Sequence, residues 1–235
     1  MIPPLAERLR PKNLSTYIGQ EHLVGEGKPV RQQIKNGVLP SIIFWGPPGT
    51  GKTTLAQIIA EQSDRPFYKL SAINAGVKDV REVINQAKRN DGLFTSKNPI
   101  LFIDEIHRFS KSQQDSLLEA VEKGWVTLIG ATTENPSFEV ISALLSRCQV
   151  YVLNALSKKD LEALLEHAIT HDEILKSKNI GLKDTEELIR LSGGDARKLL
   201  NLFELIVNNL NDDLKVISNE VVLNQIQNRT VRYDK

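Results

Sequence analysis

An eight-residue phosphate-binding pattern constrains the fold of this chain more than any other feature. Residues 46–53 read Gly-Pro-Pro-Gly-Thr-Gly-Lys-Thr, which fits G-x-x-x-x-G-K-[ST]. The short apolar run Ile42–Trp45 precedes the pattern, and the helical pattern Thr54–Gln62 follows it. A buried strand, a glycine-rich loop and a helix in this order predict a P-loop, which belongs to a parallel α/β sheet.

The residue types in this loop suit a nucleoside triphosphate. Glycines allow backbone N–H groups to converge on phosphate oxygens, and the helix N-terminus adds partial positive charge. We expect Lys52 to neutralise the β- and γ-phosphates and Thr53 to offer its hydroxyl to Mg²⁺, so the predicted cofactors are ATP and Mg²⁺. The expected nucleotide-binding residues of the loop are Gly46, Pro47, Pro48, Gly49, Thr50, Gly51, Lys52, Thr53 and Thr54.

Two patterns divide the chain. All ten prolines lie between Pro3 and Pro136, and up to about residue 154 short apolar runs alternate with helical patterns, which favours a parallel five-stranded sheet flanked by helices. Residues 137–235 contain no proline and predict an all-helical part, whose first helix has Ser157 as its N-cap. We therefore expect an α/β nucleotide-binding domain over residues 1–154 and a small helical lid domain over residues 155–235. The expected strands are Ile42–Trp45, Phe67–Leu70, Ile100–Ile103, Val126–Ile129 and Val150–Leu153.

Two adjacent carboxylates, Asp104 and Glu105, follow the third expected strand. At the carboxyl edge of the sheet, Asp104 would hold Mg²⁺ through water, and Glu105 would accept the proton of the attacking water as general base. Together with the P-loop, this pair predicts hydrolysis of ATP. The run Asp104–His107 also echoes the DExH helicase box, but other helicase motifs are absent and the chain is too short for two helicase domains.

Three later motifs narrow the class of protein. The stretch Gly130–Pro136 closes the next strand and would place a hydroxyl beside the γ-phosphate; Thr133 is the expected sensor and Thr132 the near alternative. Ser146-Arg147-Cys148 is similar to the arginine-finger motif of clamp-loader subunits. Gly193–Arg197 resembles the second sensor motif, whose arginine reaches back to the phosphates. The expected catalytic residues are therefore Lys52, Glu105, Thr133, Arg147 and Arg197.

In this order, the motifs resemble those of an AAA+ ATPase. Residues 4–11, 17–23, 104–115 and 132–138 are similar, more narrowly, to the replication-associated recombination protein A family, relatives of the Werner-helicase-interacting protein. The resemblance runs from residue 3 to the end of the chain. It implies a DNA-dependent ATPase that remodels DNA or DNA–protein assemblies at stalled or gapped replication forks.

The resemblance also implies particular residue roles and partners. Leu9, Ile18 and Gly19 would line the adenine pocket, and Ser71 would restrain Glu105. The implied partners are single-stranded, gapped or forked DNA and fork proteins such as single-strand-binding protein. Family members continue beyond this point into a helical oligomerisation domain. We therefore expect this chain to comprise the ATPase core and the lid alone. We also expect it to be mostly monomeric, although the family forms homo-oligomers.

Composition agrees with a soluble protein but does not itself indicate DNA. The formal net charge is +1, so no excess of basic residues points to nucleic acid, and DNA binding rests on the resemblance. No apolar run approaches the roughly 18 residues of a membrane helix, and no signal peptide is evident. Cys148 is the single cysteine, which excludes an internal disulfide. We expect a bacterial cytoplasmic protein associated with the nucleoid.

Other functions remain open at this point. A clamp-loader-like subunit shares the Ser-Arg-Cys motif, and the RuvB branch-migration motor shares Gly-Ala-Thr-Thr. A nucleotide-dependent interaction module with little turnover is the competitor of another class, against which the intact Lys52, Asp104 and Glu105 argue. His167 and His171 lie four residues apart, but no third metal ligand is evident, which favours solvated helix residues.

Overall fold

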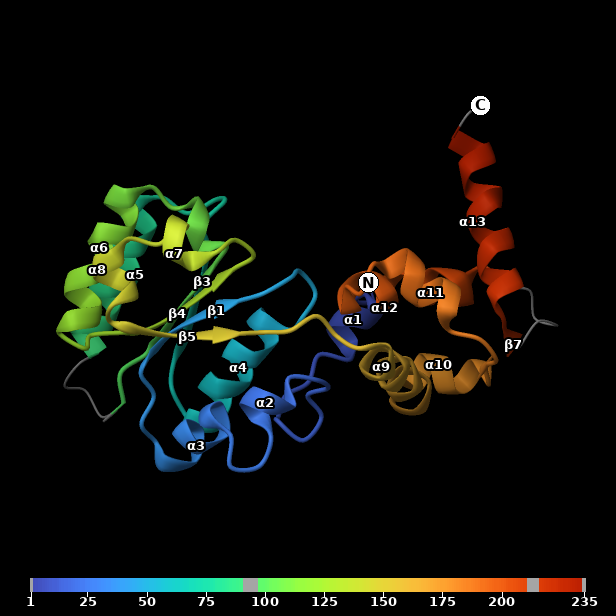
Figure 1. Ribbon diagram of the computed structural model, residues 1–235, viewed down its shortest axis with the longest axis horizontal. Helices are drawn as coiled ribbons and strands as arrows, with labels where there is room; N and C mark the ends of the chain where they lie inside the picture. The colour runs from blue at the N-terminus through green and yellow to red at the C-terminus, as the bar shows by residue number, and fades with distance from the viewer. Residues whose placement is uncertain (1, 91–96, 211–215, 234–235) are drawn as a thin grey trace. The chain divides into compact units, whose positions relative to one another are not determined.

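A five-stranded parallel sheet forms the framework of the computed structural model, which describes residues 2–90, 97–210 and 216–233 (Figure 1). The strand order is β2-β3-β4-β1-β5, so the strand before the P-loop pairs with β4 on one side and β5 on the other. All five predicted strands are present, and β4 extends three residues beyond the predicted run, to Thr132. The strands are β1 (Ser41–Trp45), β2 (Phe67–Ser71), β3 (Ile100–Asp104), β4 (Thr127–Thr132) and β5 (Cys148–Val152).

Helices cover both faces of this sheet. Along β1, β3 and β4 the side chains alternate between two separate buried clusters, as the two-residue period of a strand requires. The first cluster contains residues of α2, α3 and α4, and the second contains residues of α5, α6 and α8. The helices of this unit are α2 (Glu21–Val24), α3 (Pro29–Asn36), α4 (Lys52–Ser63), α5 (Val77–Asn90), η1 (Ile106–Arg108, a 3₁₀ turn), α6 (Lys111–Glu122), α7 (Pro136–Glu139) and α8 (Ser142–Leu145).

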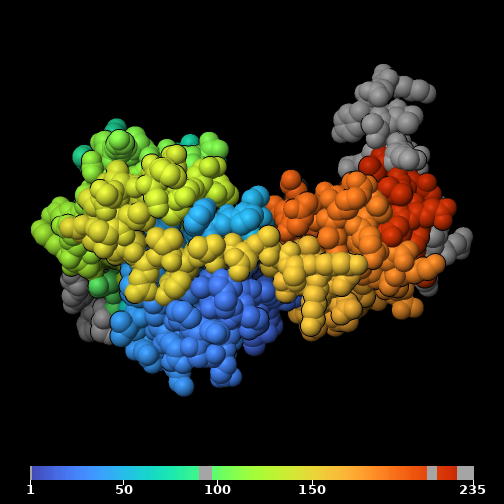
Figure 2. All heavy atoms as spheres, in the orientation of Figure 1, coloured from blue at the N-terminus to red at the C-terminus, as the bar shows by residue number. Residues whose placement is uncertain are grey.

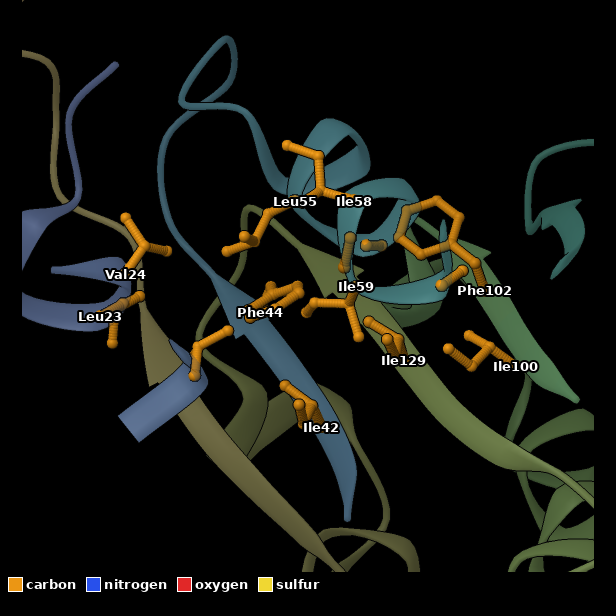
Figure 3. Close-up of a cluster of buried hydrophobic side chains, with 14 of the residues drawn as sticks. Leu23, Val24, Ile42, Phe44, Leu55, Ile58, Ile59, Ile100, Phe102 and Ile129 are labelled. Atoms are coloured by element: carbon orange, nitrogen blue, oxygen red, sulfur yellow. The ribbon is translucent and has the colours of Figure 1, made fainter. Parts of the chain in front are cut away.

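The helix that follows the P-loop is held by the first cluster. Leu55, Ile58 and Ile59 of α4 are fully buried and belong to the same cluster as Ile42 and Phe44 of β1 (Figure 3). Burying a side chain of this size stabilises the fold by about 1.5–3 kcal/mol. The packing therefore fixes α4, and with it the end of the P-loop, against the middle of the sheet.

A second group of elements is largely helical, as predicted. Ser157 caps its first long helix in a capping box with Asp160, which confirms the predicted start. A short parallel ladder of β6 with β7 joins the helices, an addition to the predicted all-helical part. The elements are α1 (Leu5–Arg8), α9 (Lys158–His171), α10 (Glu173–Lys178), β6 (Gly181–Leu182), α11 (Glu186–Ser192), α12 (Ala196–Asn208), β7 (Val216–Ile217) and α13 (Asn219–Tyr233).

The first ten residues belong to this helical unit. The chain divides into Pro11–Asn154 and a second unit made of Met1–Arg10 with Ala155–Lys235. The boundary between Asn154 and Ala155 is where the sequence places it. However, α1 belongs to the helical unit, whereas the sequence predicts it in the α/β domain. The reason is that Leu5 of α1 is fully buried in the cluster formed by α9–α13.

A charge network anchors α1 more specifically. The Arg8 guanidinium binds both carboxylate oxygens of Asp172, at 2.7 and 3.0 Å, and donates to Glu204 at 2.6 Å. Glu204 also accepts the backbone N–H of Leu5, at 2.8 Å. The Asp172 side chain is 5% exposed and that of Arg8 15%, so this pair is shielded from solvent.

We predict that Asp172→Asn lowers the free energy of unfolding of the helical unit by about 2 kcal/mol at pH 7, because Arg8 loses its more buried charged partner and keeps only Glu204. The hydrogen bonds from Arg8 lower the pKa of Asp172. The contribution of the Asp172 carboxylate to the free energy of unfolding is therefore present above its unfolded pKa of about 3.9. This contribution is lost as the pH falls below that value.

The measurement is chemical denaturation of the native and variant chains between pH 3 and pH 7. The difference between them should shrink below about pH 4. Glu187→Gln is the matched control, because its partner Arg190 is 64% exposed and solvent-exposed ion pairs contribute little to stability. A difference that stays constant from pH 7 to pH 3 would contradict the assigned role of Asp172.

Candidate functional site

The P-loop connects the carboxyl end of β1 to α4, as predicted. Its first residue, Gly46, donates its N–H to the carbonyl of Thr132 at 3.2 Å. A Cβ atom at Gly46 would lie 2.2 Å from the Leu153 carbonyl oxygen, so only glycine fits between the neighbouring strands. Gly51 has φ +93°, a conformation that favours glycine, and is the N-cap of α4. Because glycine has no side chain to cap the helix, the first-turn N–H groups remain suited to an anion.

Lys52 directs its ammonium group into this loop. The side chain is buried, and Nζ donates to the carbonyl oxygens of Gly46 and Pro47, each at 2.7 Å. The Thr50 hydroxyl donates to the Pro47 carbonyl at 2.9 Å and stiffens the same turn. A buried cation beside uncapped helical N–H groups fits the phosphates of a nucleotide in both charge and hydrogen bonding.

Tyr17 supports the loop from outside, a role that the sequence did not reveal. Its hydroxyl donates to the Thr50 carbonyl at 3.2 Å, and its ring lies against the position of Gly51. Burial raises the pKa of Tyr17, so the phenol keeps its proton and remains a donor. In the sequence, Tyr17 is marked only by its place in the stretch 17–23, which carries the family resemblance, immediately before Ile18.

Gln20 and His22, which follow Gly19, bind the backbone at the carboxyl end of β5. The Gln20 side-chain amide donates to the Asn154 carbonyl and accepts the Asn154 N–H, each at 2.8 Å. An imidazole nitrogen of His22 lies 2.8 Å from the Val152 carbonyl. These bonds fix the position of half-buried Ile18 and of Gly19, which has φ 81°. Leu9, the third residue expected at the adenine, lies in the helical unit, packed against its core.

The carboxylates Asp104 and Glu105 lie at the same edge of the sheet as the P-loop. Asp104 is the last residue of β3, and β4 and β1 end at this edge with Thr132 and Trp45. Glu105 has φ 55°, which turns the chain out of the strand into η1. Its carboxylate lies 3.5 Å from Nδ1 of His107. The edge thus brings together a hydroxyl, a cation and two carboxylates, the groups that Mg²⁺-dependent phosphoryl chemistry uses.

The expected role of Ser71 as the restraint on Glu105 stays a prediction. Ser71 pairs with Asp104 in the β2–β3 register, whereas the partner of the Glu105 carboxylate in the described residues is His107. The left-handed turn at Glu105 explains the difference, because it folds the chain back and brings the residue two positions later to the carboxylate.

The two threonines of the sensor motif differ in environment. Thr132 is fully buried as the last residue of β4, and its hydroxyl bonds to the Glu134 backbone and to His107. Thr133 follows the strand and is half-buried. The hydroxyl of Thr132 is therefore committed to protein groups, which favours Thr133 as the predicted phosphate sensor.

Arg147 lies at the opposite edge of the sheet from the P-loop. It precedes Cys148, which pairs with Ser41 at the start of β1, whereas the P-loop follows the end of β1. Five strand residues at about 3.3 Å each separate these edges by roughly 16 Å. The Arg147 side chain is 39% exposed, and its guanidinium pairs with Glu122 at 2.5 Å. The segment with α7, α8 and β5 lies at the surface of the unit (yellow, Figure 2).

Arg197 is exposed in the first turn of α12, in the helical unit. Asp195 caps this helix by accepting the backbone N–H groups of Arg197 and Lys198. Its predicted role at the phosphates stays a prediction.

A buried amide holds the segment that leads to Arg147. Gln114 of α6 donates to the carbonyls of Phe109 and Glu139, at 3.1 and 3.0 Å, and accepts the N–H of Ile141 at 2.9 Å. The side chain is 1% exposed and joins α6 to the connection between α7 and α8. Sequence reasoning missed this residue, because nothing local distinguishes it from the neighbouring Gln113.

The remaining candidates add no second site. His167 and His171 stack with ring centroids 4.0 Å apart, and burial lowers the pKa of His167. In the described part of the chain, no three His, Cys, Asp or Glu side chains are placed to hold a metal ion. Burial raises the pKa of Cys148 to about 12, so its thiol stays protonated. Among the described helices, none is long and apolar enough to cross a membrane.

Two family models match this chain. The model described as the ATPase family associated with various cellular activities (AAA) matches residues 42–156. The model described as the AAA C-terminal domain matches residues 176–235. The first match contains the P-loop and the sheet edge described above, and the second lies within the helical unit.

Curated relatives and solved structures agree with these matches. Replication-associated recombination protein A of Coxiella burnetii is 49% identical over 86% of this chain and 46% of that protein. ATPase WRNIP1 of Dictyostelium discoideum is 45% identical over 87% of this chain and 23% of that protein. The RuvB Holliday junction branch migration motor of Thermotoga maritima has a TM-score of 0.72 and 27% identity, over 93% of this chain and 72% of that one. The chain spans about half the length, or less, of the curated relatives that it matches.

We predict that Gln114→Ala lowers the free energy of unfolding by about 3 kcal/mol, because it leaves one N–H and two carbonyls without partners. Native-state hydrogen exchange should show faster exchange of the Ile141 amide. Gln86→Ala, at an exposed position of α5, is the control and should leave this amide unchanged. Unaltered protection of Ile141 in Gln114→Ala would show that another group holds the segment.

Proposed function

The chain belongs to the AAA ATPases and is similar over most of its length to replication-associated recombination protein A; we propose that it binds ATP with Mg²⁺ and hydrolyses it. The observation that carries this proposal is the buried Lys52 ammonium inside a glycine-capped P-loop, at the sheet edge where Asp104 and Glu105 also lie. Cation, helix N-terminus and carboxylates are complementary to a nucleoside triphosphate and to the water that attacks it.

Each residue of the edge has a proposed role. Thr53 and Asp104 would hold Mg²⁺, which when bound neutralises phosphate charge; one or two protein ligands are usual for this ion, because the phosphates supply others. Lys52 would bind the β- and γ-phosphates in place of its present carbonyl partners. Glu105 would accept the proton of the attacking water, and Thr133 would orient the γ-phosphate.

Other roles rest more on resemblance. Leu9, Ile18 and Gly19 are proposed to contact the adenine, and Arg197 the phosphates. For Arg147, the location at the amino edge of the sheet supports action on the nucleotide of a neighbouring subunit, because an arginine side chain does not span the sheet. We propose a homo-oligomer as the active form.

The names of the relatives suggest the setting of the reaction. Replication-associated recombination protein A is named for recombination, and RuvB is named as a Holliday junction branch migration motor. For this chain, we propose that ATP turnover remodels DNA or DNA–protein assemblies at stalled or gapped replication forks. Single-strand-binding protein is a proposed partner, and the bacterial nucleoid is the proposed location.

Two substitutions separate binding from hydrolysis. Lys52→Ala should weaken ATP binding in calorimetry by about 100-fold, since charge-assisted hydrogen bonds worth about 3 kcal/mol together are lost. Glu105→Gln should keep the ATP affinity but lower hydrolysis by ~10²-fold or more, because an amide cannot take the proton. Lys35→Ala, exposed on α3, is the control. Native ATP affinity in Lys52→Ala would refute the site, and native turnover in Glu105→Gln would place the base elsewhere.

Arg147→Ala should lower turnover by about 10³-fold, the usual contribution of an arginine finger. If Arg147 acts between subunits, mixing Arg147→Ala with Glu105→Gln combines an intact base with an intact finger at some interfaces. The ATPase rate of the mixture should then exceed the sum of the separate rates at high protein concentration, with and without forked DNA. Arg89→Ala, exposed on α5, should change nothing. A mixture that gives only the sum would contradict action between subunits.

A further inference from the structure

His107 lies between the proposed base and the end of the neighbouring strand. It belongs to η1, two residues after Glu105, and its side chain is 12% exposed. Nδ1 lies 3.0 Å from the hydroxyl oxygen of Thr132 and 3.5 Å from Oε2 of Glu105. One ring nitrogen thus faces a hydroxyl and a carboxylate together.

The surroundings of Thr132 determine which tautomer this arrangement requires. The hydroxyl donates its proton to the Glu134 carbonyl at 3.1 Å and accepts the Glu134 N–H at 3.0 Å. A hydroxyl has one proton and two acceptor sites, so the remaining site needs a donor. Nδ1 of His107 fills this site when it carries a proton. The same nitrogen lies 3.5 Å from the Glu105 carboxylate.

We propose that His107 is a positioning residue for ATP hydrolysis, which holds the Glu105 carboxylate by sharing its Nδ1–H between Glu105 and Thr132. The inference rests on the proposed role of Glu105 as the base. Glu105 follows the strand in a left-handed conformation, and its side chain is 28% exposed, so backbone packing alone restrains the carboxylate little. The contact involves one carboxylate oxygen, which leaves the other for the proton of water. The imidazole keeps its own proton throughout.

The same contacts connect the base to the P-loop. The Thr132 carbonyl accepts the N–H of Gly46, the first residue of the loop, at 3.2 Å. A continuous path therefore runs from Gly46 through Thr132 and His107 to Glu105. Each link is a hydrogen bond or a close polar contact between groups on adjacent strands or their ends. These contacts fix the position of the Glu105 carboxylate relative to the loop that is proposed to bind the phosphates.

Substitutions at His107 distinguish positioning from filling space. Asparagine places an N–H where Nδ1–H lies, whereas glutamine is closer to histidine in size but reaches toward the position of Nε2. We expect His107→Ala and His107→Gln to lower kcat about 10-fold or more with an unchanged KM for ATP, and His107→Asn to stay within about threefold of native. His171→Ala, at an exposed position, is the control for loss of a histidine. A better kcat in His107→Gln than in His107→Asn would overturn the proposal.

Thr132 supplies the second arm of the test. Thr132→Val removes the acceptor but keeps the shape, and should lower kcat; Thr132→Ser should retain it. The double variant of His107→Ala with Thr132→Val should be no slower than the slower single variant, because both break one path. A kcat of the double variant that falls by the product of the two single-variant factors would overturn the proposal.

A spectroscopic measurement does not depend on turnover. Long-range ¹⁵N–¹H correlation spectra of the native chain should show His107 as the Nδ1–H tautomer, and Thr132→Val should alter its nitrogen shifts. The Nε2–H tautomer in the native chain would overturn the inference. If Lys52→Ala retains full turnover, the proposed function fails, whatever the tautomer. If Lys52→Ala and Glu105→Gln are inactive while His107→Ala has native kcat, the positioning role alone fails.

Discussion

Hydrogen bonds between the ends of three parallel strands determine where the P-loop can be. Gly46 donates to Thr132 of β4, and Leu153, just after β5, donates to Trp45 of β1 at 2.7 Å. The carbonyl of Leu153 occupies the space that a side chain at Gly46 would need. The start of the loop is thereby fixed from both sides. A shift of one residue in either pairing would move the loop and turn the side chains of the shifted strand to the wrong faces.

The sequence predicted the features that depend on neighbouring residues. Runs such as Ile100–Ile103 are apolar at every position because both faces of the sheet are covered, and the structure places them in two separate clusters. The P-loop pattern and the Ser157 cap are equally local signals. The position of Asp104 and Glu105 beside the P-loop also followed, because carboxyl ends of parallel strands meet at one edge of a sheet. These parts of the fold and of the candidate site need no knowledge of distant contacts.

Several features that the sequence did not predict depend on partners in other segments of the chain. Arg8 joins the helical unit through Asp172 and Glu204, which are more than 160 residues away. Gln114 looks like any polar residue of a helix until the backbone between α7 and α8 surrounds it. A side chain of this kind is recognisable only when its hydrogen-bond partners are known, because periodicity and composition say nothing about pairing between segments.

The groups proposed for catalysis fall into two physical classes. Lys52 is buried and hydrogen-bonded in the loop after β1, and Glu105 and His107 contact each other directly after β3, so little conformational entropy is lost when these groups act. Arg147 and Arg197 are exposed at helix ends, and ordering a side chain of this type costs up to about 2 kcal/mol. In the proposed mechanism, the base is therefore present before nucleotide binds, whereas Arg197 contributes only when another contact orders it, and Arg147 only when such a contact replaces its ion pair with Glu122. An ATPase built in this way has its turnover controlled by whatever supplies that contact, such as a neighbouring subunit, and not by the assembly of the base.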